Sequence, residues 1–115
     1  MIPTCYEKVY VMTFLPTGKK YVGKTTQMLK YRLSSHLSAL RHGVHSSKEL
    51  QKDFNEHGGT IDNFKMEYMG KQVLRRDLHM DKERELMVQL KTYDPNYGYN
   101  VQDHSMRKYV RENGL

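Results

Sequence analysis

Residues 9–23 read VYVMTFLPTGKKYVG, and the expected architecture follows from them. Residues 9–15 are rich in β-branched and aromatic side chains and are apolar on both alternating faces. This pattern predicts a central strand that is covered on both sides. The turn residues Pro16-Thr17-Gly18 and the extended residues 19–23 predict a second, antiparallel strand that completes a hairpin.

Two helices are expected after the hairpin. The first is predicted over about residues 28–41, where leucines recur at helical spacing at Leu29, Leu33, Leu37 and Leu40. A capping box formed by Ser46 and Glu49 predicts a second, short helix that has Ser46 as its N-cap and ends at Gly58-Gly59.

The second half of the chain predicts one more strand and one more helix. Phe64, Met66 and Tyr68 alternate with charged residues, which is typical of an edge strand with one solvent-exposed face. A helix is expected over about residues 76–91, with inward-facing side chains at Leu78, Leu86, Met87 and Leu90.

The expected order is strand, strand, helix, helix, strand, helix. It predicts an α/β (α+β) fold, in which helices flank a small, three-stranded, mainly antiparallel sheet. A chain of 115 residues has the size of one domain, which we expect over residues 1–101, with a polar tail or linker at 102–115. This length excludes a doubly wound parallel-sheet enzyme and an eight-stranded barrel enzyme.

The charge of the chain is unevenly distributed. Lys and Arg total 19 and Asp and Glu total 13, which gives a net charge of +6. No acid lies between Lys8 and Lys48, whereas eight basic residues do, the two ends included: Lys8, Lys19, Lys20, Lys24, Lys30, Arg32, Arg41 and Lys48. Such a segment favours binding to a polyanion with phosphate groups, and a solvated basic face is the alternative.

Cysteine use and hydropathy indicate the setting. Cys5 is the only cysteine, so an internal disulfide and a cysteine-based zinc site are both excluded. No apolar run approaches the ~18 residues of a membrane span, and the first residues do not resemble a secretory signal. We therefore expect a cytoplasmic protein that does not enter a membrane.

Residues 18–25, GKKYVGKT, match the phosphate-loop pattern of nucleotide triphosphatases. The loop must curl so that its backbone N–H groups surround an anion, whereas Lys-Lys-Tyr-Val prefers an extended strand. We therefore reject this match, and nucleotide hydrolysis with it.

Several residue types suited to phosphodiester chemistry fall at positions that the fold would bring together. Tyr10 and Tyr21 lie on the two arms of the hairpin, and Arg32 and His36 are one helical turn apart. His45 precedes the second helix, where backbone N–H groups attract phosphate. Two further candidates are Glu85, on the last helix, and Asn100, in a tyrosine-rich segment after it.

In order and type, these residues resemble the GIY-YIG nuclease family. Val9-Tyr10 stands at the first motif and Tyr21-Val22-Gly23 at the second. They are followed by Arg32-x3-His36, His45-Ser46-Ser47, Glu83-Arg84-Glu85 and Gly98-Tyr99-Asn100. The resemblance covers about residues 8–101 and is greatest to the catalytic domain of phage intron-encoded homing endonucleases. Lys8 departs from the family, which has Gly at that position.

The resemblance implies a metal-dependent DNA endonuclease with double-stranded DNA as its partner. Its catalytic residues would be Tyr10, Tyr21, Arg32, His36, His45, Glu85 and Asn100. Glu85 would hold one divalent ion, Mg²⁺ or Mn²⁺, and Arg32 would neutralise charge on the phosphate. Tyr10 would accept a proton from the attacking water or position it, and Asn100 would orient its neighbours. The oligomeric state stays open, a dimer on DNA included.

The residues expected to contact DNA are Lys19, Lys20, Gly23, Lys24, Lys30, Arg41, Ser46 and Lys48. Gly23 is expected to leave room for the backbone of the substrate. Taken singly, each candidate has a structural alternative: a core tyrosine, a solvated arginine, a surface histidine or a surface ion pair. The competing function is a non-catalytic nucleic-acid-binding module with the same fold.

Overall fold

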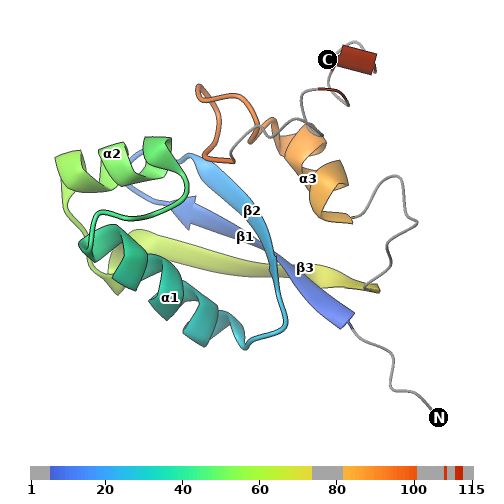
Figure 1. Cartoon of the computed structure of the whole chain (residues 1–115), viewed down its shortest axis with the longest axis horizontal. Coiled ribbons are helices and arrows are strands. Elements are labelled where there is room, and N and C mark those ends of the chain that lie inside the picture. The colour runs from blue at the N-terminus through green and yellow to red at the C-terminus, as the bar shows by residue number, and fades with distance from the viewer. Residues whose placement is uncertain (1–5, 74–81, 101–107, 109–110, 113–115) are drawn as a thin grey trace.

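The computed structural model describes residues 6–73, 82–100, 108, 111 and 112 (Figure 1). Its elements, in chain order, are β1 (Tyr6–Phe14), β2 (Lys20–Thr25), α1 (Leu29–Arg41), α2 (Lys48–His57), the 3₁₀ turn η1 (Ile61–Asn63), β3 (Phe64–Val73) and α3 (Lys82–Leu90). This order confirms the predicted fold, with one added 3₁₀ turn.

The three strands form one antiparallel sheet in the order β2-β1-β3, so β1 is central and β3 is an edge strand, as predicted. Tyr10 lies directly opposite Gly23 of β2. The pairing of β1 with β3 shifts by one residue between Val9 and Tyr10, so β3 carries an extra residue at this point. Such a bulge bends the strand and changes the direction of nearby side chains.

Both faces of β1 are covered, and successive residues alternate between two cores. Tyr10, Met12 and Phe14 pack against α1 and α2. Val9 and Val11 pack on the opposite face against Met87 of α3. Figure 1 shows this division, with α1 and α2 together on one side and α3 apart from them.

The leucine stripe buries α1 against the sheet: Leu33, Leu37 and Leu40 are buried and Leu29 is partly buried. The N-cap of α2 is Ser47, and the prediction of Ser46 was wrong by one residue. The Ser47 hydroxyl accepts the backbone N–H of Leu50, whereas Ser46 is exposed. A Ser-Ser pair provides two adjacent capping oxygens, and the buried position of Leu50 determines which of them is used.

The described part of the predicted last helix is Lys82–Leu90, in which Met87 is buried and Leu86 and Leu90 are partly buried. Residues 76–81, including Leu78, lie outside the described residues, as does most of the predicted tail at 102–115. After α3 the chain returns to the sheet, where Gly98 forms a parallel bridge with Lys20.

Residues 20–25 of the rejected phosphate-loop match form β2, so this part of the motif is extended. Among the described helices, none is long and apolar enough to span a membrane.

Candidate active site

The site is built around the hydroxyl of Tyr10, a fully buried side chain of the central strand. This hydroxyl lies 2.6 Å from His36 Nε2 and accepts a hydrogen bond from Arg32 Nε at 3.1 Å. Both partners come from α1, because residues 32 and 36 lie on the same side of the helix. The predicted cluster of Tyr10, Arg32 and His36 is therefore present.

Gly23 makes room for Tyr10 and not for a substrate, which corrects our expectation for this residue. A Cβ atom at position 23 would lie 2.4 Å from Cζ and 2.4 Å from Oη of Tyr10. Real Cβ atoms do not approach so closely, so any larger residue would displace the tyrosine ring. The glycine of the second motif thus holds the tyrosine of the first in place.

His45 extends the cluster from the other side. His36 Nδ1 lies 2.8 Å from His45 Nε2, and His45 Nδ1 accepts the backbone N–H of Ser47 at 3.0 Å. The two imidazole rings stack with their centroids 5.0 Å apart. Tyr21 packs edge-on against both rings, at 5.2 Å from His36 and 6.1 Å from His45. Five of the seven predicted catalytic residues therefore lie together.

Burial keeps the histidines neutral. Desolvation, with smaller contributions from the charges of Arg32 and His45, lowers the pKa of His36 to about 3. Desolvation also lowers the pKa of His45, against a hydrogen bond from Ser47 that raises it. Neither imidazole therefore carries a charge at neutral pH.

Burial has the opposite effect on the tyrosines. It raises the pKa of Tyr10 to about 12, although the hydrogen bond from Arg32 lowers it, and it also raises the pKa of Tyr21. Both phenols are therefore protonated at neutral pH unless a further cation enters the site.

Two glutamates of α3 stand in different places. The Glu83 side chain is partly buried, and its charge contributes to the raised pKa of both Tyr10 and Tyr21. Glu85, the predicted metal ligand, is exposed in the first turn of the helix. Spacing alone does not determine how a helix is rotated, so the sequence did not show that Glu83 is the more buried of the two.

The carboxylates of α3 suit a hard cation. Among the described residues, no group of three or more His, Cys, Asp or Glu side chains could enclose a metal ion. Mg²⁺ does not need such a group, because it binds through one or two carboxylates and keeps several waters. The carboxylate of Glu85, exposed in the first turn of α3, therefore fits Mg²⁺ or Mn²⁺ and does not fit a metal held by a full protein cage.

Asn100 holds the second strand in position. Its Oδ1 accepts the backbone N–H of Val22 at 2.9 Å, and its Nδ2 donates to the carbonyl of Val22 at 2.7 Å. Val22 lies between Tyr21 and Gly23, so the amide fixes the backbone that carries the second motif. This agrees with the orienting role that the resemblance implies.

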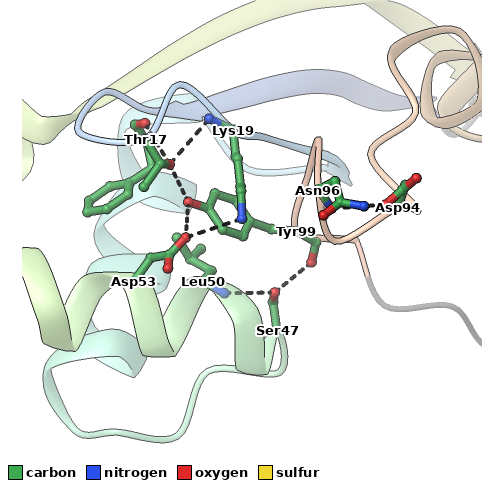
Figure 2. A network of polar contacts seen from close by, with 9 residues as sticks. Thr17, Lys19, Ser47, Leu50, Asp53, Asp94, Asn96 and Tyr99 are labelled. Carbon is green, nitrogen blue, oxygen red and sulfur yellow. Dashed lines mark hydrogen bonds and ion pairs between the residues drawn. The ribbon is translucent and has the colours of Figure 1, made fainter.

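A second polar network, which sequence reasoning missed, lies beside the site (Figure 2). The Tyr99 hydroxyl donates to Asp53 Oδ2 at 2.7 Å and lies 2.5 Å from Thr17 Oγ1. The Ser47 hydroxyl donates to the Tyr99 carbonyl at 2.6 Å. The sequence held one sign of this network. Asp53 lies next to Phe54 and three residues after Leu50, which places a carboxylate on the buried face of α2, where it needs a polar partner.

The residues predicted to contact DNA divide into two groups. Lys19 lies 3.9 Å from Asp53, Lys24 lies 3.9 Å from Glu7, and Lys20 donates to Thr13 at 2.9 Å. The others have exposed side chains at helix ends or beside them: Lys30, Arg41, Ser46 and Lys48. Acids outside the acid-free segment therefore approach part of it in space.

The chain is similar to a known protein family and to solved structures of one endonuclease domain. The profile of the GIY-YIG catalytic domain matches residues 6–100. A mutant of the catalytic domain of the intron endonuclease I-TevI is 26% identical, with a TM-score of 0.70, over 86% of this chain and 96% of that one. The catalytic domain of the homing endonuclease I-TevI is 28% identical, with a TM-score of 0.67, over 84% and 99%. No curated protein sequence matches the chain.

The neutral histidines predict a stability that falls in mild acid. Their pKa values are lower in the folded chain than in the unfolded chain, where histidine titrates near ~6.5. The unfolded chain therefore binds more protons as the pH falls from about 6.5 towards 3, and the free energy of unfolding decreases. We expect a loss of at most about 1.4 kcal/mol per pH unit for each histidine.

Urea unfolding at several pH values between 7.5 and 5 measures this loss. His36→Gln should reduce the slope, whereas His42→Gln, at an exposed position, should leave it as it is. Equal slopes for the wild type and His36→Gln would contradict the assignment.

Proposed function

The chain belongs to the GIY-YIG catalytic domain family, and on this premise we propose that it is a metal-dependent endonuclease that hydrolyses phosphodiester bonds in double-stranded DNA. The observation that carries this proposal is the convergence of Arg32 and His36 on the Tyr10 hydroxyl, with His45 hydrogen-bonded to His36 behind them. A binding module has no need of a buried phenol that is hydrogen-bonded to a guanidinium and an imidazole. The likeness to I-TevI, an intron endonuclease, supports the same proposal.

The protein's own groups divide the reaction between them. Tyr10 handles the proton of the attacking water, and Arg32 lies beside it to neutralise charge that develops on the phosphoryl oxygens. His36 and Tyr21 hold the Tyr10 side chain in place, and His45 in turn holds His36. Asn100 keeps β2 in register, so that Tyr21 and Gly23 stay opposite β1.

The metal ion is proposed to bind at the start of α3. Glu85 is the proposed ligand, because it is exposed and therefore open to an incoming ion and to the phosphate of the substrate. A bound Mg²⁺ or Mn²⁺ would supply Lewis-acid polarisation of the phosphate and stabilisation of the leaving oxygen. Glu83 adds negative charge beside the two tyrosines, which a cation in the site would offset.

Tyr10→Phe tests the central role of the hydroxyl. If Tyr10 handles the water's proton, the cleavage rate should fall by ~10²–10⁴. The matched control is Tyr68→Phe, because Tyr68 pairs with Tyr10 across the sheet but has an exposed side chain. Rates on supercoiled plasmid and melting temperatures are the measurements. Cleavage within a few-fold of the wild type would make Tyr10 a packing residue.

The two glutamates of α3 can be separated by mutation. We expect Glu85→Gln to abolish Mg²⁺-dependent nicking and to leave DNA binding intact, because the change removes the charge that holds the ion. Glu83→Gln should keep the metal dependence, because it removes a charge that acts on the tyrosines. Plasmid nicking over a Mg²⁺ titration measures both effects. If only Glu83→Gln abolished nicking, the proposed ligand would be wrong.

DNA binding is proposed to use the exposed basic residues near the helix ends. Lys30→Glu should weaken binding to unrelated duplexes by similar factors, because phosphate contacts carry no sequence information. It should also lower the slope of log K against log salt by about 0.9 for each lost phosphate contact. Lys65→Glu, at an exposed position of β3 that is not at a helix end, is the control. An unchanged salt slope for Lys30→Glu would exclude this residue from the interface.

A further inference from the structure

The hydrogen bonds from Ser47 to Tyr10 form a chain with only one possible direction. It runs from Ser47 N to His45 Nδ1, from His45 Nε2 to His36 Nδ1, and from His36 Nε2 to the Tyr10 hydroxyl. A backbone N–H can only donate, so His45 Nδ1 must be the unprotonated nitrogen of its ring. The proton of His45 is therefore on Nε2, from which it points to His36.

The same reasoning applies to the second ring. His36 Nδ1 accepts from His45, so His36 carries its proton on Nε2 and donates it to the oxygen of Tyr10. A charged His45 would carry a proton on Nδ1, which lies 3.0 Å from the backbone nitrogen of Ser47. Two N–H donors would then face each other with no acceptor between them. A charged His36 would leave His45 without any proton. The geometry alone thus fixes both rings as neutral Nε2–H tautomers.

The consequence falls on Tyr10. Its oxygen accepts one hydrogen bond from His36 and another from Arg32 Nε, so both lone pairs of the neutral phenol are occupied. The proton of Tyr10 must then point to the remaining direction, away from α1. A neutral Tyr10 in this state has no lone pair left to take a proton from water.

We propose that the backbone N–H of Ser47 is the positioning group of the site, which fixes both histidine tautomers and makes the Tyr10 oxygen a double acceptor. Resting on the proposed function, this means that Tyr10 acts only as the phenolate. Tyr10 first loses its own proton to solvent. The lone pair that this leaves on the phenolate oxygen then accepts one proton of the attacking water. The oxygen of that water forms the bond to phosphorus while the bond from phosphorus to the leaving sugar oxygen breaks. The leaving oxygen takes a proton from solvent, and the phenol of Tyr10 is restored.

Ser47 is well held for this role. It is almost fully buried, and its hydroxyl donates to the Tyr99 carbonyl and accepts the N–H of Leu50. Tyr99 is in turn bonded to Asp53 of α2 (Figure 2). These contacts add to the packing around Ser47, and its backbone N–H alone sets the direction of the chain of hydrogen bonds.

The direct test is the protonation state of the imidazole nitrogens, measured by ¹⁵N NMR on the full chain labelled at histidine, without metal or DNA. Both His36 and His45 should be Nε2–H tautomers at neutral pH. An Nδ1–H tautomer or a charged ring at either residue would overturn the proposal. This measurement is independent of cleavage, so correct tautomers in a protein that does not cut DNA would refute the proposed function and leave the positioning role intact.

Two variants isolate the N–H group. Ser47→Ala removes the hydroxyl and keeps the N–H, whereas Ser47→Pro removes both, at a φ of −86° that is close to the proline value. We expect His45 to become a mixture of tautomers only in Ser47→Pro. Relative to Ser47→Ala, that variant should cleave plasmid roughly tenfold more slowly or worse at neutral pH, because the phenolate loses a donor.

The pH–rate profile gives the second readout. The apparent pKa of its rising limb should be higher in Ser47→Pro than in Ser47→Ala, since a phenolate with one donor fewer forms less readily. A folded Ser47→Pro with unchanged tautomers and the same profile as Ser47→Ala would overturn the proposal. If Ser47→Pro does not fold, the wild-type spectrum decides the matter by itself.

Discussion

The ring of Tyr10 occupies the space where a side chain at position 23 would lie, and the site depends on that fit. Because the ring lies flat across Gly23, its hydroxyl reaches α1, where Arg32 and His36 meet it. The antiparallel register then places Tyr21 on the same face, against both histidines. A single glycine in an edge strand thus lets a residue of the central strand pack in the core and present its hydroxyl to the candidate site.

Local patterns were enough to predict the framework. Each element has a pattern within its own residues: the alternation along residues 9–15, the turn at Pro16–Gly18 and the leucines of α1. Such a pattern predicts the element and its buried face without knowledge of the rest of the fold. Ser47 was missed because the capping-box pattern, which requires Glu three residues later, fits only Ser46, whereas in the structure Ser47 accepts the backbone N–H of Leu50. The direction of the histidine chain was also beyond sequence reasoning, because it joins residues 26 and 9 positions apart through tertiary packing.

The charge pattern along the sequence also differs from the charge pattern on the folded protein. The sequence predicts a segment of one charge sign, yet folding brings Asp53 to Lys19 and Glu7 to Lys24. The positive charge that a polyanion would meet is therefore carried by fewer residues than the run of basic residues suggests, at the ends of α1 and α2. The family resemblance, by contrast, depends on residue types in order, and these were readable from the sequence alone.

The phenol of Tyr99 joins segments that are far apart along the chain, and this has a consequence for the order of assembly. It contacts Thr17 across 82 residues and Asp53 across 46. Contacts of such long range form late, because closing a long loop costs entropy before the contact compensates for it. During synthesis, Tyr10, Arg32 and both histidines emerge well before Tyr99 and Asn100. A nascent chain therefore carries the side chains of the candidate site before the segment that anchors Ser47 and β2, so the site can take its final geometry only after Tyr99 and Asn100 have joined the fold.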